Sequence, residues 1–257
     1  MSKVQGPRSK VECIVEWLGR AGYGEVLALQ RNWASARTQG LVEDCLLLVE
    51  HPPVITLGRG AKRGHLLADE DLLRAQGIEV WETERGGDVT FHGPGQLVGY
   101  PILDLTRHGK DLHHYMRRLE EVLMRTLHRY RIHGERSAGQ TGVWVGEAKI
   151  ASIGVHVTRW VSRHGFALNV NTDLRFFDLV VPCGLSGVRM TSIAALLGRT
   201  VPVETVAEAT AQEFAAVFDC RPRPVSHGSL AVLYRQQGMV CDGAAAVAKA
   251  AGAEYRS

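Results

Sequence analysis

The sequence predicts a single domain of the α/β class, and three observations carry this prediction. A continuous apolar run at residues 45–49 is typical of a strand that is buried on both faces. Apolar residues recur at three- and four-residue steps over residues 111–132, which is the period of an amphipathic helix. Helical and strand-like segments are intermixed along the chain, and no internal repeat or linker divides it. We therefore expect a single mixed α/β domain.

Glycine and proline mark the ends of the elements in the first half of the chain. Gly40 and Gly77 end two helices, since glycine readily adopts the conformation of a helix C-terminus. Pro52 stops the first strand because proline cannot donate to a sheet ladder. The expected elements are a helix at 24–40, strands at 45–49 and 54–57, a short helix at 69–76, strands at 78–81 and 96–105, and a long helix at 111–132.

The second half begins with strands and ends with helices. The expected elements are strands at 142–145 and 148–158 joined by a tight turn at 146–147, a second turn near 161–165, a strand from 166, a loop-like segment at 171–188, a short helix at 191–197 capped by Thr191 or Ser192, and helices at 204–218 and 226–237. Residues 1–20 are expected to be flexible. The alanine-rich residues 243–257 have few large apolar anchors and are expected to be disordered.

Composition excludes several classes of protein. The 257 residues are 45% hydrophobic and 22% charged, an ordinary globular composition, and no stretch has the apolar length of a membrane helix. Five scattered cysteines without a Cys-x-x-Cys pair argue against a disulfide framework or a zinc knuckle and favour the reducing cytoplasm. The four histidines 113, 114, 128 and 133 lack metal-site spacing. The net charge of +3 is too small to imply nucleic acid.

Residues 85–100 form the most unusual segment of the chain. They read Arg-Gly-Gly-Asp-Val-Thr-Phe-His-Gly-Pro-Gly-Gln-Leu-Val-Gly-Tyr and contain five glycines. We interpret them as a tight loop that enters a strand, with Arg85 and exposed N–H groups suited to a carboxylate, a phosphate or a carbonyl ligand. A hairpin with only a structural role is the alternative. The basic loop at 58–64 either faces an acidic partner or is simply solvated.

Lys149 and Cys183 break the local rules of their segments. Strand alternation puts Lys149 on an apolar face, so it either reaches water at the end of the sheet or is buried with a partner. Cys183, between Pro182 and Gly184, lies in an irregular segment where a thiol is accessible, and a nearby lysine would stabilise its thiolate. An incidental loop thiol is the alternative. No Cys/His/Asn triad spacing is evident, although His92 and His156 remain possible bases.

These segments together resemble the signature of the lipoyl(octanoyl) transferases. The resemblance starts in residues 85–100 and continues through Gly-Val-Trp-Val at 142–145 and Lys-Ile-Ala-Ser-Ile-Gly at 149–154. It also includes Gly-Phe-Ala-Leu-Asn-Val-Asn at 165–171 and Val-Pro-Cys-Gly-Leu at 181–185. The motifs occur in the family's order and span roughly residues 25 to 220.

The resemblance implies a fold, a reaction and a set of site residues. The fold is the mixed α/β fold of the biotin and lipoate protein ligases, with a mixed sheet flanked by helices and a catalytic domain at 21–242. Cys183 would carry the acyl group as a thioester and Lys149 would activate it. The substrate-binding residues would be Arg85, Gly86, Gly87, Asp88, Val89, Thr90, Phe91, His92, Ser152, Ile153, Gly154, Gly165, Phe166 and Ala167. Backbone N–H groups of the glycine-rich loop are our own candidates for an oxyanion hole.

The implied reaction moves an octanoyl or lipoyl group from acyl carrier protein to a lysine. The acceptors would be the lipoyl domains of 2-oxo acid dehydrogenases and the glycine cleavage H protein. No metal or nucleotide cofactor is expected. We expect the protein to be a cytoplasmic monomer without nucleic-acid or membrane partners. Two alternatives remain: an ATP-dependent lipoate or biotin protein ligase on the same fold, and a non-catalytic module whose basic loop docks an acidic carrier protein.

Overall fold

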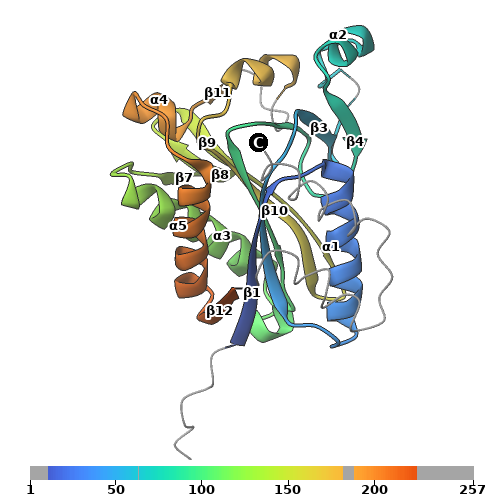
Figure 1. Cartoon of the computed structure of the whole chain (residues 1–257), viewed down its shortest axis with the longest axis vertical. Helices are drawn as coiled ribbons and strands as arrows, with labels where there is room; N and C mark the ends of the chain where they lie inside the picture. Colours follow the sequence, from blue (N-terminus) through green and yellow to red (C-terminus); the bar gives the residue numbers. More distant parts are fainter. Residues whose placement is uncertain (1–10, 63, 182–187, 225–257) are drawn as a thin grey trace, which may run out of the picture.

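The computed structural model describes residues 11–62, 64–181 and 188–224, and these residues form two β-sheets with helices packed around them (Figure 1). The larger sheet has the order β12-β1-β2-β6-β10-β9-β8-β7, and β11 pairs with β9 outside this path. Its strands are β1 (Val11–Arg20), β2 (Asp44–Glu50), β6 (Gln96–Ile102), β7 (Glu135–Ser137), β8 (Gln140–Val145), β9 (Ala148–Thr158), β10 (Val161–Asn169), β11 (Arg189–Met190) and β12 (Cys220–Pro224).

The larger sheet is mixed. β1 runs parallel to both β2 and β12, and β11 runs parallel to β9. The pairs from β2 through β6, β10, β9 and β8 to β7 are all antiparallel. This arrangement confirms the predicted mixed α/β class.

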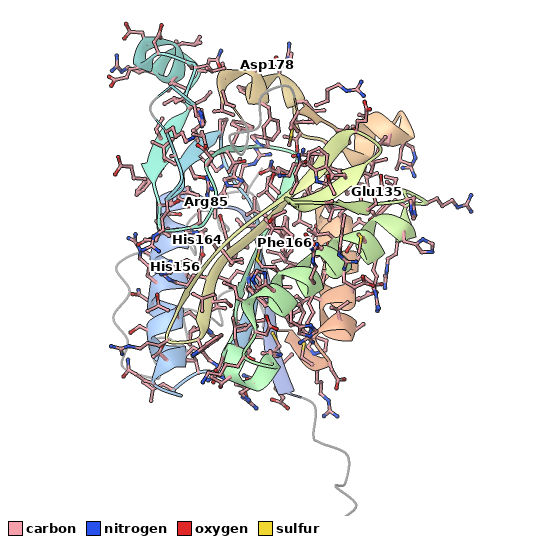
Figure 2. The ribbon with its side chains drawn as sticks, turned by 180° about the vertical axis from the view of Figure 1, so that it is seen from behind. Arg85, Glu135, His156, His164, Phe166 and Asp178 are labelled. Carbon is pink, nitrogen blue, oxygen red and sulfur yellow. The ribbon has the colours of Figure 1, made fainter. Side chains whose placement is uncertain are left out.

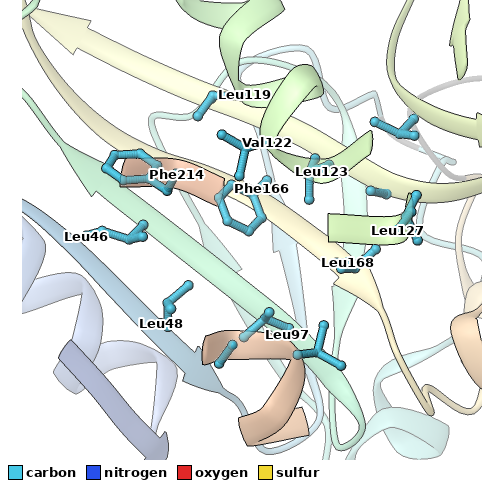
Figure 3. Close-up of a cluster of buried hydrophobic side chains, with 14 of the residues drawn as sticks. Leu46, Leu48, Leu97, Leu119, Val122, Leu123, Leu127, Phe166, Leu168 and Phe214 are labelled. Carbon is cyan, nitrogen blue, oxygen red and sulfur yellow. The ribbon is translucent and has the colours of Figure 1, made fainter. Parts of the chain in front are cut away.

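Helices cover both faces of the larger sheet (Figure 1). α1 (Tyr23–Thr38) lies on one face, and α3 (Leu112–Arg129) and α5 (Val203–Val217) lie on the other. Strand β2 shows why the apolar run at 45–49 is continuous: Leu46 and Leu48 pack toward α3 and α5, whereas Leu47 and Val49 pack toward α1. Figure 3 shows the first of these cores, in which Leu46, Leu97 and Phe166 meet the helical residues Leu123 and Phe214.

The smaller sheet has the order β4-β3-β5. Its strands are β3 (Val54–Leu57), β4 (Glu79–Glu82) and β5 (Val89–His92), with β3 parallel to β4 and antiparallel to β5. A separate core joins it to the 3₁₀ helix η2 (Leu174–Leu179) through Phe91, Phe176 and Phe177. The remaining short helices are α2 (Glu70–Ala75), η1 (Leu105–His108) and α4 (Ile193–Leu197). None of the described helices is both long and apolar enough to cross a bilayer.

Several sequence-based expectations differ from the structure. The segment at 171–188, expected to be loop-like, contains the 3₁₀ helix η2. Residues 11–20, expected to be flexible, form β1, whose Cys13 and Ile14 are buried. The turn expected near 161–165 lies instead at Arg159 and Trp160, whose φ angles are +51° and +64°, and residue 161 already belongs to β10. The strand expected to reach residue 105 ends at residue 102. The predicted helix at 226–237 and the tail at 243–257 lie outside the described residues.

Candidate active site

A cavity of about 480 Å³, counted with its open mouth, lies where the two sheets meet. The wall combines the N-terminus of α1, the 85–88 loop, β5 of the smaller sheet, and β6, β9 and β10 of the larger one. The lining residues are Tyr23, Arg85, Gly86, Gly87, Asp88, Thr90, His92, Val98, Tyr100, Ser152, Ile153, Gly154, His164, Gly165, Phe166 and Ala167.

The structure brings together nearly all of the substrate-binding residues that the resemblance implied. Only Val89 and Phe91 are missing from the wall. Because successive side chains of a strand point to opposite faces, Thr90 and His92 face the cavity while Val89 and Phe91 face the core around Ile55. These two residues therefore support β5 from behind rather than line the cavity.

Arg85 is held against β3 by several hydrogen bonds. Its Nε donates to Thr56 Oγ1 at 3.1 Å, and its Nη2 donates to the Thr56 carbonyl at 2.6 Å and to Thr56 Oγ1 at 2.8 Å. Its Nη1 donates to the Gly86 carbonyl at 3.2 Å. Since the side chain is only 7% exposed, the guanidinium shapes the wall from a fixed position.

The backbone of the 85–88 loop is tied to its neighbours on two sides. The Gly86 N–H donates to the Val155 carbonyl of β9 at 2.8 Å. The Gly58 and Gly60 N–H groups donate to the carbonyls of Asp88 and Gly87 at 3.1 and 2.9 Å. The basic loop is therefore bound to the wall of the cavity. The Gly86 N–H, which we considered for an oxyanion hole, is already used by Val155.

The histidines around the cavity are neutral at neutral pH. Burial lowers the pKa of His51 to about 4 and that of His92 to about 3. Burial and then the charge of Arg163 lower the pKa of His164 to about 3. Figure 2 shows His164 near Arg85 and His156, with Glu135 and Asp178 well away from them. Of the two bases considered from the sequence, His92 lines the cavity and His156 does not.

Lys149 is buried within β9. It is 2% exposed, so the interpretation in which it reaches water at the sheet end is wrong. It pairs with Trp144 of β8 and with Met190 of β11, and its Nζ lies 5.5 Å from the centre of the Trp144 ring. Gly142 leaves room for it, since a Cβ there would lie 2.7 Å from Lys149 Cε. Lys149 is not part of the cavity wall.

Cys183 lies outside the described residues. The described chain stops at Val181, whose N–H donates to the His65 carbonyl, and resumes at Val188 just before β11. The thiols that are described, Cys13, Cys45 and Cys220, are free and buried, and none lines the cavity. Burial raises the pKa of the Cys45 thiol well above its usual value, which makes it a poor nucleophile.

Sequence reasoning missed four wall residues: Tyr23, Val98, Tyr100 and His164. Alternation along β6 contained a signal for two of them, because Val98 and Tyr100 point to the same face. His164 precedes the Gly165 motif directly. No local pattern marked Tyr23, which reaches the cavity because α1 packs on the sheet beside His51.

Comparisons with known proteins agree with this fold. Residues 22–215 match the model of the lipoyl protein ligase A/B catalytic domain. The chain is 51% identical over 212 residues to the octanoyltransferase of Solibacter usitatus, covering 82% of this chain and 96% of that one. It is 47% identical over 216 residues to the octanoyltransferase of Acidobacterium capsulatum, covering 78% and 88%.

A solved structure shows the same fold. Protein Ta0514 of T. acidophilum, solved with bound lipoic acid, superposes with a TM-score of 0.69 over 93% of both chains, although only 17% of the residues are identical. The family model and the identity to curated relatives, both spread over most of the chain, lead to one conclusion. The chain belongs to the octanoyltransferases of the lipoyl protein ligase A/B catalytic family.

Proposed function

We propose that this octanoyltransferase takes an octanoyl or lipoyl group from acyl carrier protein and transfers it to a lysine of a lipoyl domain. The acceptors would be the lipoyl domains of 2-oxo acid dehydrogenases and the glycine cleavage H protein. The observation that carries the proposal is the kinship to octanoyltransferases over about four fifths of the chain. The cavity supports it, because Val98 and Ala167, which belong to the apolar cluster on the α1 face of the sheet, give its wall a surface for an acyl chain.

The proposed chemistry proceeds through Cys183. Its thiolate attacks the thioester carbonyl, the bond to the carrier sulfur breaks, and the carrier thiolate leaves and takes a proton. The neutral amine of the target lysine then attacks the acyl-enzyme, so that a C–N bond forms and the C–S bond to Cys183 breaks. Cys183 leaves as the thiolate, and the nitrogen loses one proton to solvent, which balances the proton taken up by the carrier thiolate. The first exchange is close to balanced, since one thioester replaces another. The second is favourable because an amide is more stable than a thioester.

Lys149 is proposed to stabilise the Cys183 thiolate. Its burial supports this role, since a buried ammonium acts more strongly on a nearby anion than a solvated one does. The pairing of Met190 with Lys149 supports it as well, because Met190 follows Cys183 by only a few residues along the chain. The apolar wall would shield the acyl-enzyme from hydrolysis.

Mass spectrometry after incubation with octanoyl carrier protein tests the covalent step. We expect one octanoyl adduct per chain, labile to hydroxylamine, on the peptide that contains Cys183. Cys183→Ser should lose most turnover, because an alcohol is far less ionised than a thiol. Cys220→Ser, at a buried thiol outside the cavity wall, is the matched control and should retain the adduct. Normal transfer by Cys183→Ala would remove Cys183 from the mechanism and favour direct transfer between the two substrates.

An ATP-dependent ligase is the second candidate, and the fold shared with a lipoic-acid-binding protein favours it. The two functions differ in their donor. A transferase uses octanoyl carrier protein without ATP, whereas a ligase uses free octanoate and ATP. Assays with each donor, with and without ATP, separate them.

We also propose that the protein acts as a cytoplasmic monomer, and sedimentation at micromolar concentration tests its oligomeric state.

A further inference from the structure

A chain of buried hydrogen bonds runs from the strand of Lys149 to the wall of the cavity. The Thr191 N–H donates to the Lys149 carbonyl at 2.9 Å, and Asn169 Nδ2 donates to the Thr191 carbonyl at 3.0 Å. Gln96 Nε2 donates to Asn169 Oδ1 at 2.9 Å. The next contact joins Gln96 Oε1 to His92 Nδ1 at 2.7 Å. Gln96 and Asn169 are each 1% exposed.

The backbone carbonyls of Thr191 and Phe91 determine the direction of the side-chain bonds in this chain. A carbonyl only accepts, so the Asn169 atom that faces the Thr191 carbonyl must be the amide nitrogen. Its oxygen then faces Gln96 and must receive an N–H. The Gln96 nitrogen also donates to the Phe91 carbonyl at 3.3 Å, which gives the same assignment independently. Gln96 Oε1 is therefore the atom left to face His92.

This direction selects one tautomer of His92. Gln96 Oε1 can only accept, so His92 Nδ1 must carry the hydrogen. Because burial lowers the pKa of His92 to about 3, the ring carries a single N–H at neutral pH and Nε2 keeps a lone pair. His92 lies in the cavity wall, and no described residue donates to its Nε2.

His51, behind the wall, shows the contrasting case. Its Nδ1–H donates to the Ala21 carbonyl at 2.7 Å, which selects the same tautomer. Its Nε2 accepts from the Tyr100 hydroxyl at 2.9 Å and is therefore already used. His92 thus offers the cavity an acceptor that His51 does not.

We propose that Gln96 and Asn169 are positioning residues for acyl transfer, which hold His92 as the Nδ1–H tautomer so that its Nε2 accepts a hydrogen bond from an N–H group of the substrate. The inference rests on the proposed function for the nature of that substrate. The N–H group belongs either to the side chain of the target lysine or to an amide of the carrier-bound donor. In the opposite tautomer Nε2 would present a hydrogen to the same N–H group and repel it.

Nuclear magnetic resonance of the full chain tests the tautomer directly. Long-range ¹⁵N–¹H correlation of the imidazoles, with His92 assigned by comparison with His92→Gln, should show a protonated Nδ1 and an unprotonated Nε2. Gln96→Leu should convert this signal to a mixture of tautomers. A wild-type His92 that carries its hydrogen on Nε2 overturns the proposal, and this result requires no enzymatic activity.

Steady-state kinetics test the consequence for the reaction. Losing one neutral hydrogen bond corresponds to a roughly 2- to 10-fold change. Gln96→Leu and Asn169→Ala should therefore raise KM for one substrate by this factor, and the substrate that is affected identifies the source of the N–H. Unchanged KM values for both substrates overturn the proposal. If the wild type transfers no octanoyl group, the proposed function fails while the tautomer result stands.

Asn171→Leu is the matched control. Asn171 lies two residues after Asn169, just beyond the end of β10. Its side-chain amide donates to the Val201 carbonyl at 2.7 Å and accepts from the Val201 N–H at 3.0 Å. Its loss removes a part-buried amide with two hydrogen bonds without touching the chain to His92. We expect Asn171→Leu to have a lower melting temperature than the wild type, but the same His92 tautomer and the same KM values. An effect of Asn171→Leu equal to that of Gln96→Leu would mean that the chain has only a structural role.

Discussion

Lys149 is the charged side chain on which the proposed chemistry depends, and the space around it is made by two neighbours. Gly142, at φ +127°, allows the lysine stem to pass where a Cβ would collide with it. The Trp144 ring lies next to its ammonium group. The strand thus holds the Lys149 side chain in one place, which a residue that stabilises a thiolate requires.

Replacing Lys149 by methionine tests its effect on the thiol. If Lys149 stabilises the Cys183 thiolate, the thiol should react with iodoacetamide at lower pH than a free cysteine does. Lys149→Met keeps an unbranched side chain, and we expect it to move the reactivity profile to higher pH. Peptide mapping distinguishes Cys183 from the buried thiols. An unchanged profile would mean that Lys149 acts on the substrate alone.

Gly58 is a second residue whose lack of a side chain shapes the site. A Cβ at this position would lie 2.4 Å from the Gly87 carbonyl oxygen and 2.8 Å from Arg85 Nη1. The 85–88 loop would have to move away from the basic loop. The close approach of backbone that the glycine-rich sequence suggested is therefore present between two loops of the protein itself.

Gly58→Ala should weaken both the fold and the reaction. Overpacking typically costs about 1–3 kcal/mol, and the displaced loop carries part of the cavity wall. Urea unfolding and the rate of octanoyl transfer measure the two effects. Gly22→Ala is the control, because its Cβ would meet only the flexible Glu25 carboxylate at 3.5 Å. Wild-type stability and activity in Gly58→Ala would show that the loop adapts without cost.

At the scale of elements, β1 contributes a buried carboxyl group to the sheet. Glu16 is 4% exposed, and burial raises its pKa to about 7. A raised pKa means that the folded protein binds the proton more tightly than the unfolded chain does. Its stabilising contribution is complete below about pH 4.5 and is lost as the pH rises through about 7.

Glu16→Gln should remove this dependence. At pH 8 we expect the variant to be more stable than the wild type by roughly 1–3 kcal/mol, and the difference should shrink as the pH falls toward 4.5. Urea unfolding of both proteins at several pH values measures it. Glu12→Gln, at an exposed position near the start of the same strand, should show no such trend. A constant difference across the pH range would mean that Glu16 does not titrate between these values.

At the scale of the whole molecule, the cavity is the place where the two sheets meet. Thr90 and His92 come from the smaller sheet, while Ser152, Ile153 and Ala167 come from the larger one. The 85–88 loop connects them through the bond between Gly86 and Val155. An acyl ligand in this cavity would contact both sheets and stabilise their junction.

Octanamide, which resembles the product and cannot acylate a thiol, tests this coupling. A ligand that binds only the folded state at about ten times its Kd stabilises it by roughly 1.4 kcal/mol. We therefore expect a higher melting temperature and slower hydrogen exchange in both β5 and β9. Butanamide, with a shorter chain, should have a smaller effect. Protection confined to one sheet would place the acyl chain elsewhere.

Several features of this protein follow from short stretches of sequence. The periodicity of residues 111–132 predicted α3, and the continuous run at 45–49 predicted a strand buried on both faces. Ser192 was one of the two predicted N-caps of the helix at 193–197, and its hydroxyl accepts from the Ala195 N–H. Each prediction depends only on residues within a few positions of one another, because helix and strand periods are local. The glycine-rich loop was located for the same reason.

The tertiary structure alone decided how these pieces form a site. Residues 11–20 were not predicted as a strand, because Glu12 and Glu16 interrupt their apolar pattern and only pairing with β2 and β12 explains it. Gln96 and Asn169 are 73 positions apart, yet the pairing of β6 with β10 brings their side chains into contact. The tautomer of His92 depends on that contact. The order of strands in the sheet determines which distant side chains come into contact, and the local periodicity of the sequence does not encode that order.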